Sequence, residues 1–151
     1  MSFQVVPATG LVLEQILSDT HALWGDGLPR ANYGRAWAAQ LKTAWGQQHL
    51  DRVALVDGPH VLASAKRYDF SMRFDGRIRR VLGIGALFTA PAHRGRGCAR
   101  ELVARVLDTA VTEGQEFAML FSEIAPRRAP AGSRSPHSSI IQRPSRSVIT
   151  R

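Results

Sequence analysis

Residues 87–99 of the chain read LFTAPAHRGRGCA. An apolar, strand-like run ends at Thr89, a loop rich in glycine and arginine follows, and a helical pattern begins at Cys98. The first amide N–H groups of a helix have no partner within the helix, and the helix dipole adds partial positive charge at that end. This order of strand, loop and helix therefore presents free amide groups directly after a strand.

The glycines and arginines of this loop predict an anion site. Gly95 and Gly97 allow the backbone to curl so that several N–H groups can point at one anion. Arg94 and Arg96 add positive charge beside them. The loop lacks the Gly-Lys-Ser/Thr of a Walker loop and the third glycine of the dinucleotide fingerprint. It favours a phosphate or pyrophosphate ligand of another kind.

Upstream of the loop, the spacing of apolar residues changes from helical to strand-like. A first strand at 3–7 precedes a helix that starts after Thr9. A second helix carries apolar side chains over 33–45 and closes at Gly46. The apolar run 53–56 then predicts a short strand.

The segment before the loop predicts a long hairpin. Apolar and polar residues alternate in a strand that begins at Val61. Asp75-Gly76 is a strong turn signal, because a type I′ turn needs positive φ at both residues. The return strand is expected over 77–89.

Two further patterns complete the predicted order. Gly83 and Gly85, inside the return strand, predict a bulge or the close approach of another group. The helix from Cys98 has an apolar face and is expected to stop at Gly114. The apolar run 117–121 then predicts a buried strand.

The predicted fold class is α/β, with a mixed, mostly antiparallel sheet and packed helices. Residues 1–124 are expected to form this domain. Residues 125–151 contain four prolines, many serines and arginines, and no periodicity. Such a segment buries too little apolar surface to offset its ordering entropy, so we predict a disordered, basic tail.

Charge and composition limit the classes of function. The net charge is +8, but residues 125–151 hold six arginines and no acid, while residues 1–124 hold 14 basic and 12 acidic residues. The basic character therefore says little about what the folded part binds. The apolar runs are far shorter than the roughly 20 residues of a membrane span. With one cysteine and no visible secretory signal, we expect a cytoplasmic protein without a membrane contact.

The arginine–glycine loop resembles the acyl-CoA-binding pattern of the GNAT superfamily of N-acyltransferases, Gln/Arg-x-x-Gly-x-Gly/Ala. Arg94, Gly97 and Ala99 stand at the fixed positions of that pattern, and Pro91 and the flanking strand and helix also match. The resemblance covers residues 50–124 well and the preceding residues more loosely. It implies a GNAT-like fold and an enzyme that transfers an acetyl group from acetyl-CoA to a small molecule or peptide. In this reaction the primary amine of the acceptor attacks the thioester directly. No metal is implied.

The resemblance also assigns coenzyme contacts. The pyrophosphate is expected on the loop amides, and the pantetheine arm is expected to pair with the end of the preceding strand. The residues so implied are Leu87, Phe88, Thr89, Arg94, Gly95, Arg96, Gly97, Cys98 and Ala99.

Glu123, just after the last apolar strand, is the candidate proton acceptor or acceptor-binding group. A surface glutamate or a sheet-edge pairing is the alternative reading. Cys98 has no evident histidine or asparagine partner and is expected to pack beneath the loop, and His93 is interpreted as a loop residue. Trp24, Trp37 and Trp45 are interpreted as core or helix-packing residues, and the resemblance implies that the face of the first two helices borders the acceptor cleft.

The chain departs from the family pattern after Ile124. Family members continue with a helix that carries Tyr-Tyr and an Arg-Leu-Gly-Phe turn, and then two strands; these motifs are absent here. We therefore expect the last elements of the fold to be missing and the strand at 117–123 to present an unpaired edge.

This departure leaves alternative functions open. One is a catalytically impaired remnant that still binds acetyl-CoA. Another is a small basic protein that binds nucleic acid through its arginine tail, although the tail lacks aromatic residues to stack on bases. Non-specific, salt-dependent binding to polyanions is expected of such a tail in any case. The acceptor and the oligomeric state, a dimer included, also stay open.

Overall fold

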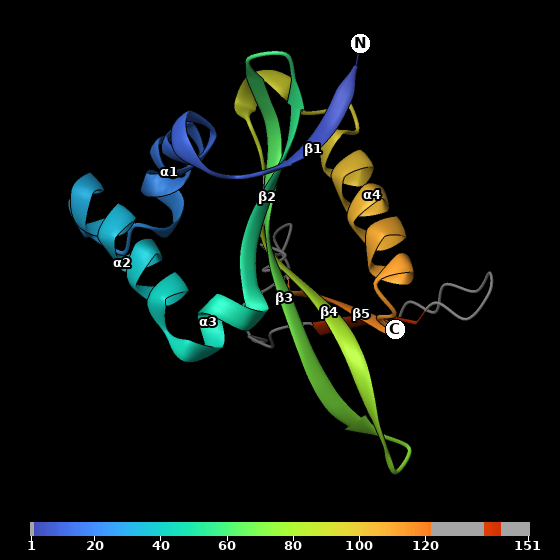
Figure 1. Cartoon of the computed structure of the whole chain (residues 1–151). Helices are drawn as coiled ribbons and strands as arrows, with labels where there is room; N and C mark the ends of the chain where they lie inside the picture. The colour runs from blue at the N-terminus through green and yellow to red at the C-terminus, as the bar shows by residue number, and fades with distance from the viewer. Residues whose placement is uncertain (1, 122–137, 143–151) are drawn as a thin grey trace, which may run out of the picture.

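The computed structural model describes residues 2–121 and 138–142, which build one sheet with helices on both faces (Figure 1). The strands lie in the order β1-β2-β3-β4-β5-β6. Neighbouring strands are antiparallel except for β4 and β5, which are parallel. The predicted α/β class with a mixed, mostly antiparallel sheet is therefore confirmed.

The strands are β1 (Phe3–Pro7), β2 (Leu50–Asp57), β3 (His60–Phe74), β4 (Arg77–Thr89), β5 (Phe117–Phe121) and β6 (Ser138–Gln142). The helices are α1 (Gly10–Trp24), α2 (Arg30–Lys42), α3 (Ala44–His49) and α4 (Cys98–Thr112), with a 3₁₀ turn, η1, at Pro91–His93. Within the described residues, no helix combines the length and apolar character that crossing a bilayer requires.

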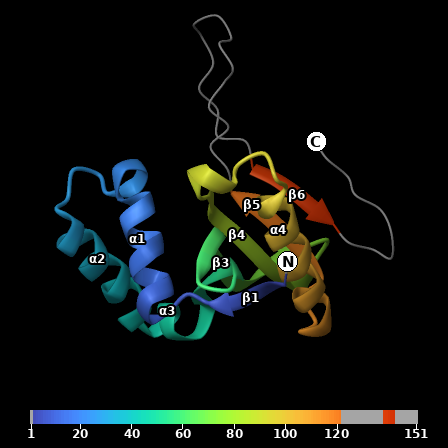
Figure 2. The same ribbon diagram turned by 90° about the horizontal axis from the view of Figure 1, so that it is seen from above.

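The main core lies between the sheet and α4. Four side chains of α4, spaced by one turn, are buried against alternate residues of β2, β3 and β4: Cys98, Leu102, Val106 and Ala110. Viewed from above, α4 lies on one side of the sheet, and α1, α2 and α3 lie on the other (Figure 2). A smaller apolar cluster, which includes Ile16 and Ala54, joins α1 to that second face.

The long hairpin forms as predicted. Asp75 and Gly76 have φ angles of 49° and 72°, the positive values that a type I′ turn needs. β4 has the predicted bounds, residues 77–89.

The second helix is shorter than predicted, because the chain breaks at Thr43. Thr43 is extended, and its hydroxyl accepts a hydrogen bond from the Gly46 N–H at 2.9 Å, so it begins the separate helix α3. Gly46 lies inside α3 and does not end α2. A Cβ at this position would overlap the main-chain oxygen of Gln40. The prediction that Gly46 closes the second helix is therefore wrong; the glycine lets α3 fold back against the end of α2.

The last strand also differs from expectation. β5 was predicted to present an unpaired edge, but β6 pairs with it antiparallel, from Phe117 opposite Gln142 to Phe121 opposite Ser138. A five-residue strand thus forms within 125–151, the segment predicted to be disordered. Glu123 lies outside the described residues, as do residues 125–137 and 143–151 of the predicted tail. The division of the chain after Ile124 stays a prediction.

Candidate active site

A bulge interrupts β4 in the middle of the sheet. Lys66 of β3 pairs with Gly85, but Ser64 pairs with Phe88, so two residues of β4 lie opposite one of β3. Ala86, one of the two, has a φ of +48°. The bulge predicted beside the glycines of this strand is confirmed, and it turns the following main chain out of the regular ladder.

Beyond the bulge, β4 separates from β5. The parallel pairing runs from Val81 opposite Phe117 to Ile84 opposite Leu120 and ends there. Residues 85–89 of β4 continue past it. Their main-chain groups on this side can pair with an extended ligand, as sheet edges do in strand addition.

Aromatic side chains pack on the glycines before the bulge. An added Cβ on Gly83 would lie 3.0–3.1 Å from atoms of Phe70, Tyr68 and Phe121, and one on Gly85 would lie 3.1 Å from the Tyr68 ring. The Tyr68 and Phe121 rings meet edge to face, with centroids 6.2 Å apart. Burial raises the pKa of Tyr68, so its hydroxyl stays protonated.

The loop after β4 has the backbone of an anion site. Arg94 Nε donates to the main-chain oxygen of Thr89 at 3.3 Å, which ties the loop to the strand end. Gly95 and Gly97 have φ angles of 75° and 76° and face open space. The hydrogen bond from Glu101 N–H to Gly97 O, 2.9 Å long, opens the α4 ladder, so the preceding amides keep the free donors of a helix start.

The nine residues implied as coenzyme contacts lie in one continuous path from the end of β4 to the first turn of α4. Two of the nine are buried, Cys98 at 4% exposure and Phe88 at 7%, and Cys98 belongs to the main core. Its Sγ lies 3.7 Å from the main-chain oxygen of His93. Cys98 therefore packs beneath the loop, as the sequence suggested.

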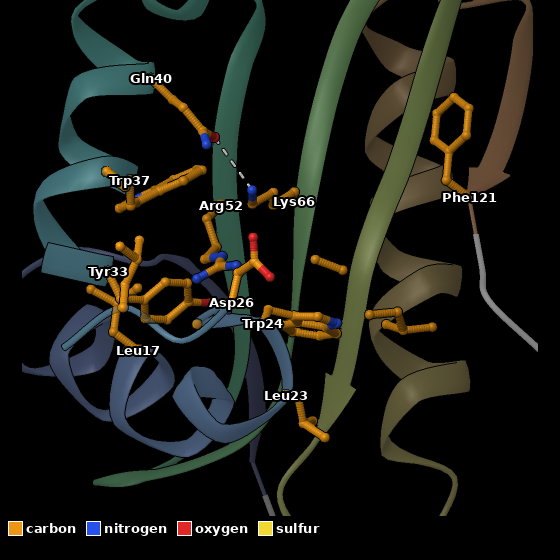
Figure 3. Close-up of a pocket in the computed structure, with 15 residues that line it drawn as sticks. Leu17, Leu23, Trp24, Asp26, Tyr33, Trp37, Gln40, Arg52, Lys66 and Phe121 are labelled. Atoms are coloured by element: carbon orange, nitrogen blue, oxygen red, sulfur yellow. Dashed lines mark hydrogen bonds between the residues drawn. The ribbon is translucent and has the colours of Figure 1, made fainter. Parts of the chain in front are cut away.

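A cavity of about 720 Å³ opens beside the bulge (Figure 3). Ala86 and Leu87 of β4 line it on one side, and Trp24 and Trp37 of the helices line it on the other. The path along β4 and the helix-side cavity therefore meet at the bulge. Trp37 is buried, at 4% exposure, whereas Trp24 and Trp45 are 38% and 48% exposed, so the interpretation as core residues is right for Trp37 alone; Trp24 and Trp37 line the cavity and Trp45 does not.

Two cations line the same cavity, and the sequence analysis missed them. Arg52 of β2 and Lys66 of β3 are direct cross-strand partners. The guanidinium carbon of Arg52 lies 4.8 Å from the centre of the Trp37 ring, and Lys66 Nζ lies 4.9 Å from it. Lys66 Nζ also donates to Gln40 Oε1 at 3.4 Å, drawn as a dashed line in Figure 3.

Burial dominates the electrostatics of this pair. It lowers the pKa of Arg52, an effect that Tyr33 partly offsets. Burial, and then the charge of Arg52, lower the pKa of Lys66. Within the described residues, no group of three or more His, Cys, Asp or Glu side chains is arranged to hold a metal.

A model of the acetyltransferase (GNAT) domain family matches residues 17–128. The chain belongs to the GNAT acetyltransferase family. A search of curated proteins found no match. The same fold also occurs in solved structures. The sequence identity to the three named below is under 25%, so the similarity concerns the fold alone.

Three such structures illustrate the likeness. A transcriptional regulator from Bacillus halodurans C-125 is 18% identical over 83% of this chain and 85% of that one, with a TM-score of 0.66. A GCN5-related N-acetyltransferase from Kribbella flavida is 24% identical over 83% of this chain and 32% of that one, with a TM-score of 0.65. An aminoglycoside N-acetyltransferase in complex with CoA is 19% identical over 83% of this chain and 78% of that one, with a TM-score of 0.60.

Proposed function

We propose that this GNAT protein transfers the acetyl group of acetyl-CoA to a primary amine by direct attack. One observation carries the proposal: after Ile84, β4 has no strand partner on its β5 side among residues 2–121 and 138–142, and this stretch leads from the glycine loop to a bulge that opens into the helix-side cavity. A donor bound along the edge and an acceptor in the cavity would meet there. Holding two reactants in one geometry is itself a large part of catalysis.

The donor half of the site would use main-chain groups. The amides of residues 95–99 would hold the pyrophosphate, while the Arg94 amide donates to Pro91 O and the Arg94 and Arg96 side chains supply nearby positive charge. Leu87, Phe88 and Thr89 would pair with the amides of the pantetheine arm as an added strand would. A backbone N–H near the bulge would donate to the thioester oxygen as negative charge develops on it.

The acceptor amine must be neutral to attack. The positive charges of Arg52 and Lys66 favour loss of the ammonium proton, because like charges disfavour the charged form. Glu123 is our candidate to receive that proton. It lies outside the described residues, two positions after Phe121, which lines the cavity. The amine nitrogen then forms the new bond to the carbonyl carbon, the carbon–sulfur bond breaks, and the proton that the nitrogen loses as it becomes an amide goes to the leaving coenzyme thiolate.

The test is release of coenzyme thiol from acetyl-CoA, followed with the full chain across a panel of primary amines. Turnover of at least one amine, above a reaction without acceptor, is the expected result. Coenzyme binding without turnover of any amine would leave the impaired remnant as the function. Absence of binding at millimolar coenzyme would overturn the proposal. We also propose a cytoplasmic location, which suits the unpaired, buried Cys98.

A further inference from the structure

The cation pair in the cavity has an unusual environment. Arg52 and Lys66 face each other across neighbouring strands, an arrangement in which like charges repel. The Arg52 side chain is only 4% exposed, and its Nε and Nη1 atoms have no hydrogen-bond partner in the described part of the chain. Buried charges are normally paired, since an unpaired one is costly.

No salt bridge in the described part of the chain joins a carboxylate to Arg52 or Lys66. Asp26 also lines the cavity, but the salt bridges among residues 2–121 do not join it to Arg52 or Lys66. The cations also contact neutral groups: both lie over the Trp37 ring, Lys66 donates to the amide of Gln40, and the Tyr33 hydroxyl interacts with Arg52. The fold thus keeps a buried arginine and a half-buried lysine beside an open cavity.

We propose that the acceptor is a primary amine that also carries a carboxylate, and that Arg52 and Lys66 bind this carboxylate. The identity of the acceptor rests on the proposed acetyl transfer, whereas the anion site does not. A carboxylate would give Arg52 the acceptor oxygens that it lacks, in the geometry to which a guanidinium is suited.

The position of the pair also limits the size of the acceptor. Arg52, Lys66 and Gly85 form one row across β2, β3 and β4, and the bulge follows Gly85. Since neighbouring strands lie about 4.8 Å apart, the main chains of Lys66 and Arg52 are roughly 5 and 10 Å from the strand that would present the thioester, and their side chains extend from there to the Trp37 ring. An amine separated from its carboxylate by a few bonds, as in an amino acid, spans that interval.

The remaining cavity wall indicates an apolar substituent. Much of it consists of leucine and aromatic side chains: Leu17, Leu23, Trp24, Leu28, Tyr33, Trp37 and Phe121. An aromatic amino acid fits this combination of cations and apolar surface. By contrast, aminoglycosides carry several ammonium groups and would meet like charge, so we expect them to be poor acceptors here even though an aminoglycoside N-acetyltransferase shares the fold.

The first experiment compares acceptors of matched shape. Wild-type protein and acetyl-CoA are assayed with phenylalanine, phenylalaninamide and phenethylamine. We expect kcat/KM for phenylalanine to exceed that of the other two by at least about thirty-fold, the usual loss when one member of a buried charge pair is removed. Equal rates, or preference for an aminoalkyl phosphate or an aminoglycoside, would overturn the carboxylate assignment.

Two variants test the named cations. Arg52→Met and Lys66→Met should each abolish the preference for phenylalanine over phenylalaninamide. Lys42→Met, which removes an exposed lysine from the end of α2, should keep that preference. Because replacement of a buried unpaired charge by an apolar side chain is often neutral or stabilising, the melting temperatures of the two cavity variants should not fall. Large drops in melting temperature with an unchanged preference would show that the cations serve only to pack on Trp37.

A binding experiment separates this proposal from acetyl transfer. N-acetylphenylalanine and its amide are titrated calorimetrically into the full chain with coenzyme A present. Tighter binding of the carboxylate, lost in Arg52→Met, supports the anion site even if no amine is turned over, in which case only the proposed catalysis fails. Equal binding of the two compounds overturns the anion site even if the protein is an active acetyltransferase.

Discussion

Replacing Gly97 with alanine tests the proposed pyrophosphate site with little change elsewhere. Gly97 precedes α4 with a φ of 76°, and an added Cβ would meet no protein atom within 4 Å. An alanine held in this left-handed conformation costs about 1–2 kcal/mol. For a domain of this size that corresponds to a fall of roughly 2–8 °C in melting temperature, so the variant should still fold.

The effect on coenzyme binding should be larger than the effect on folding. The open space at Gly97 is where the bound pyrophosphate would lie against the loop amides. The added Cβ would push the pyrophosphate away from a loop amide. Loss of one such hydrogen bond to a charged group costs about 1.5–3 kcal/mol, which is roughly a ten- to hundred-fold loss of affinity. Calorimetric titration with coenzyme A should show this loss, and the salt dependence of wild-type binding should reflect the phosphate charges.

Gly76→Ala is the matched control. Gly76 lies at the hairpin turn with a φ of 72°, and it too has no protein atom within 4 Å of an added Cβ. The control should lose a similar amount of stability and keep wild-type affinity for coenzyme A. If both variants bind coenzyme A as the wild type does, the pyrophosphate does not lie on this loop and the donor site must be sought elsewhere.

Three further predictions follow from other parts of the structure. Gly46→Ala should lower stability by about 1–3 kcal/mol in thermal unfolding, because its Cβ would overlap Gln40; an unchanged melting temperature would contradict the tight α2–α3 junction. The pKa of Lys66 is lowered, so as the pH is raised the side chain should lose its charge, and the protein its preference for carboxylates, before pH 10.5 is reached. Lys66→Arg should extend the preference to higher pH, and identical pH profiles would count against a role for this charge. Glu123→Gln should lower kcat by about a hundred- to ten-thousand-fold with coenzyme affinity unchanged, and a wild-type kcat would exclude it as the base.

The strands and α4 were predictable because their signals are local. Alternation of apolar residues and the Asp75-Gly76 turn determine β3 and β4 without reference to the rest of the chain. The spacing of Leu102 and Val106 likewise marks the buried face of α4. Each of these patterns describes residues that are neighbours in sequence and in space.

The errors arose where a local cap or a distant contact overrides the apolar pattern. Thr43 breaks the second helix through a cap on Gly46, although the apolar spacing continues across it to Trp45. Nothing in residues 138–142 shows alternation strong enough to predict a strand, and they become β6 by pairing with β5. Strand propensity depends strongly on such context.

The two halves of the candidate site differ in the same way. The donor half is one segment, residues 87–99, so its chemistry can be read directly from consecutive residues. The acceptor half is assembled from α1, α2, β2 and β3, and Arg52 and Lys66 become neighbours only through the register of the sheet. A lone arginine before an apolar strand and a lone lysine within another are ordinary in sequence. They acquire meaning when the sheet sets them side by side, with no salt bridge to either among the described residues, at the bulge where the donor path ends.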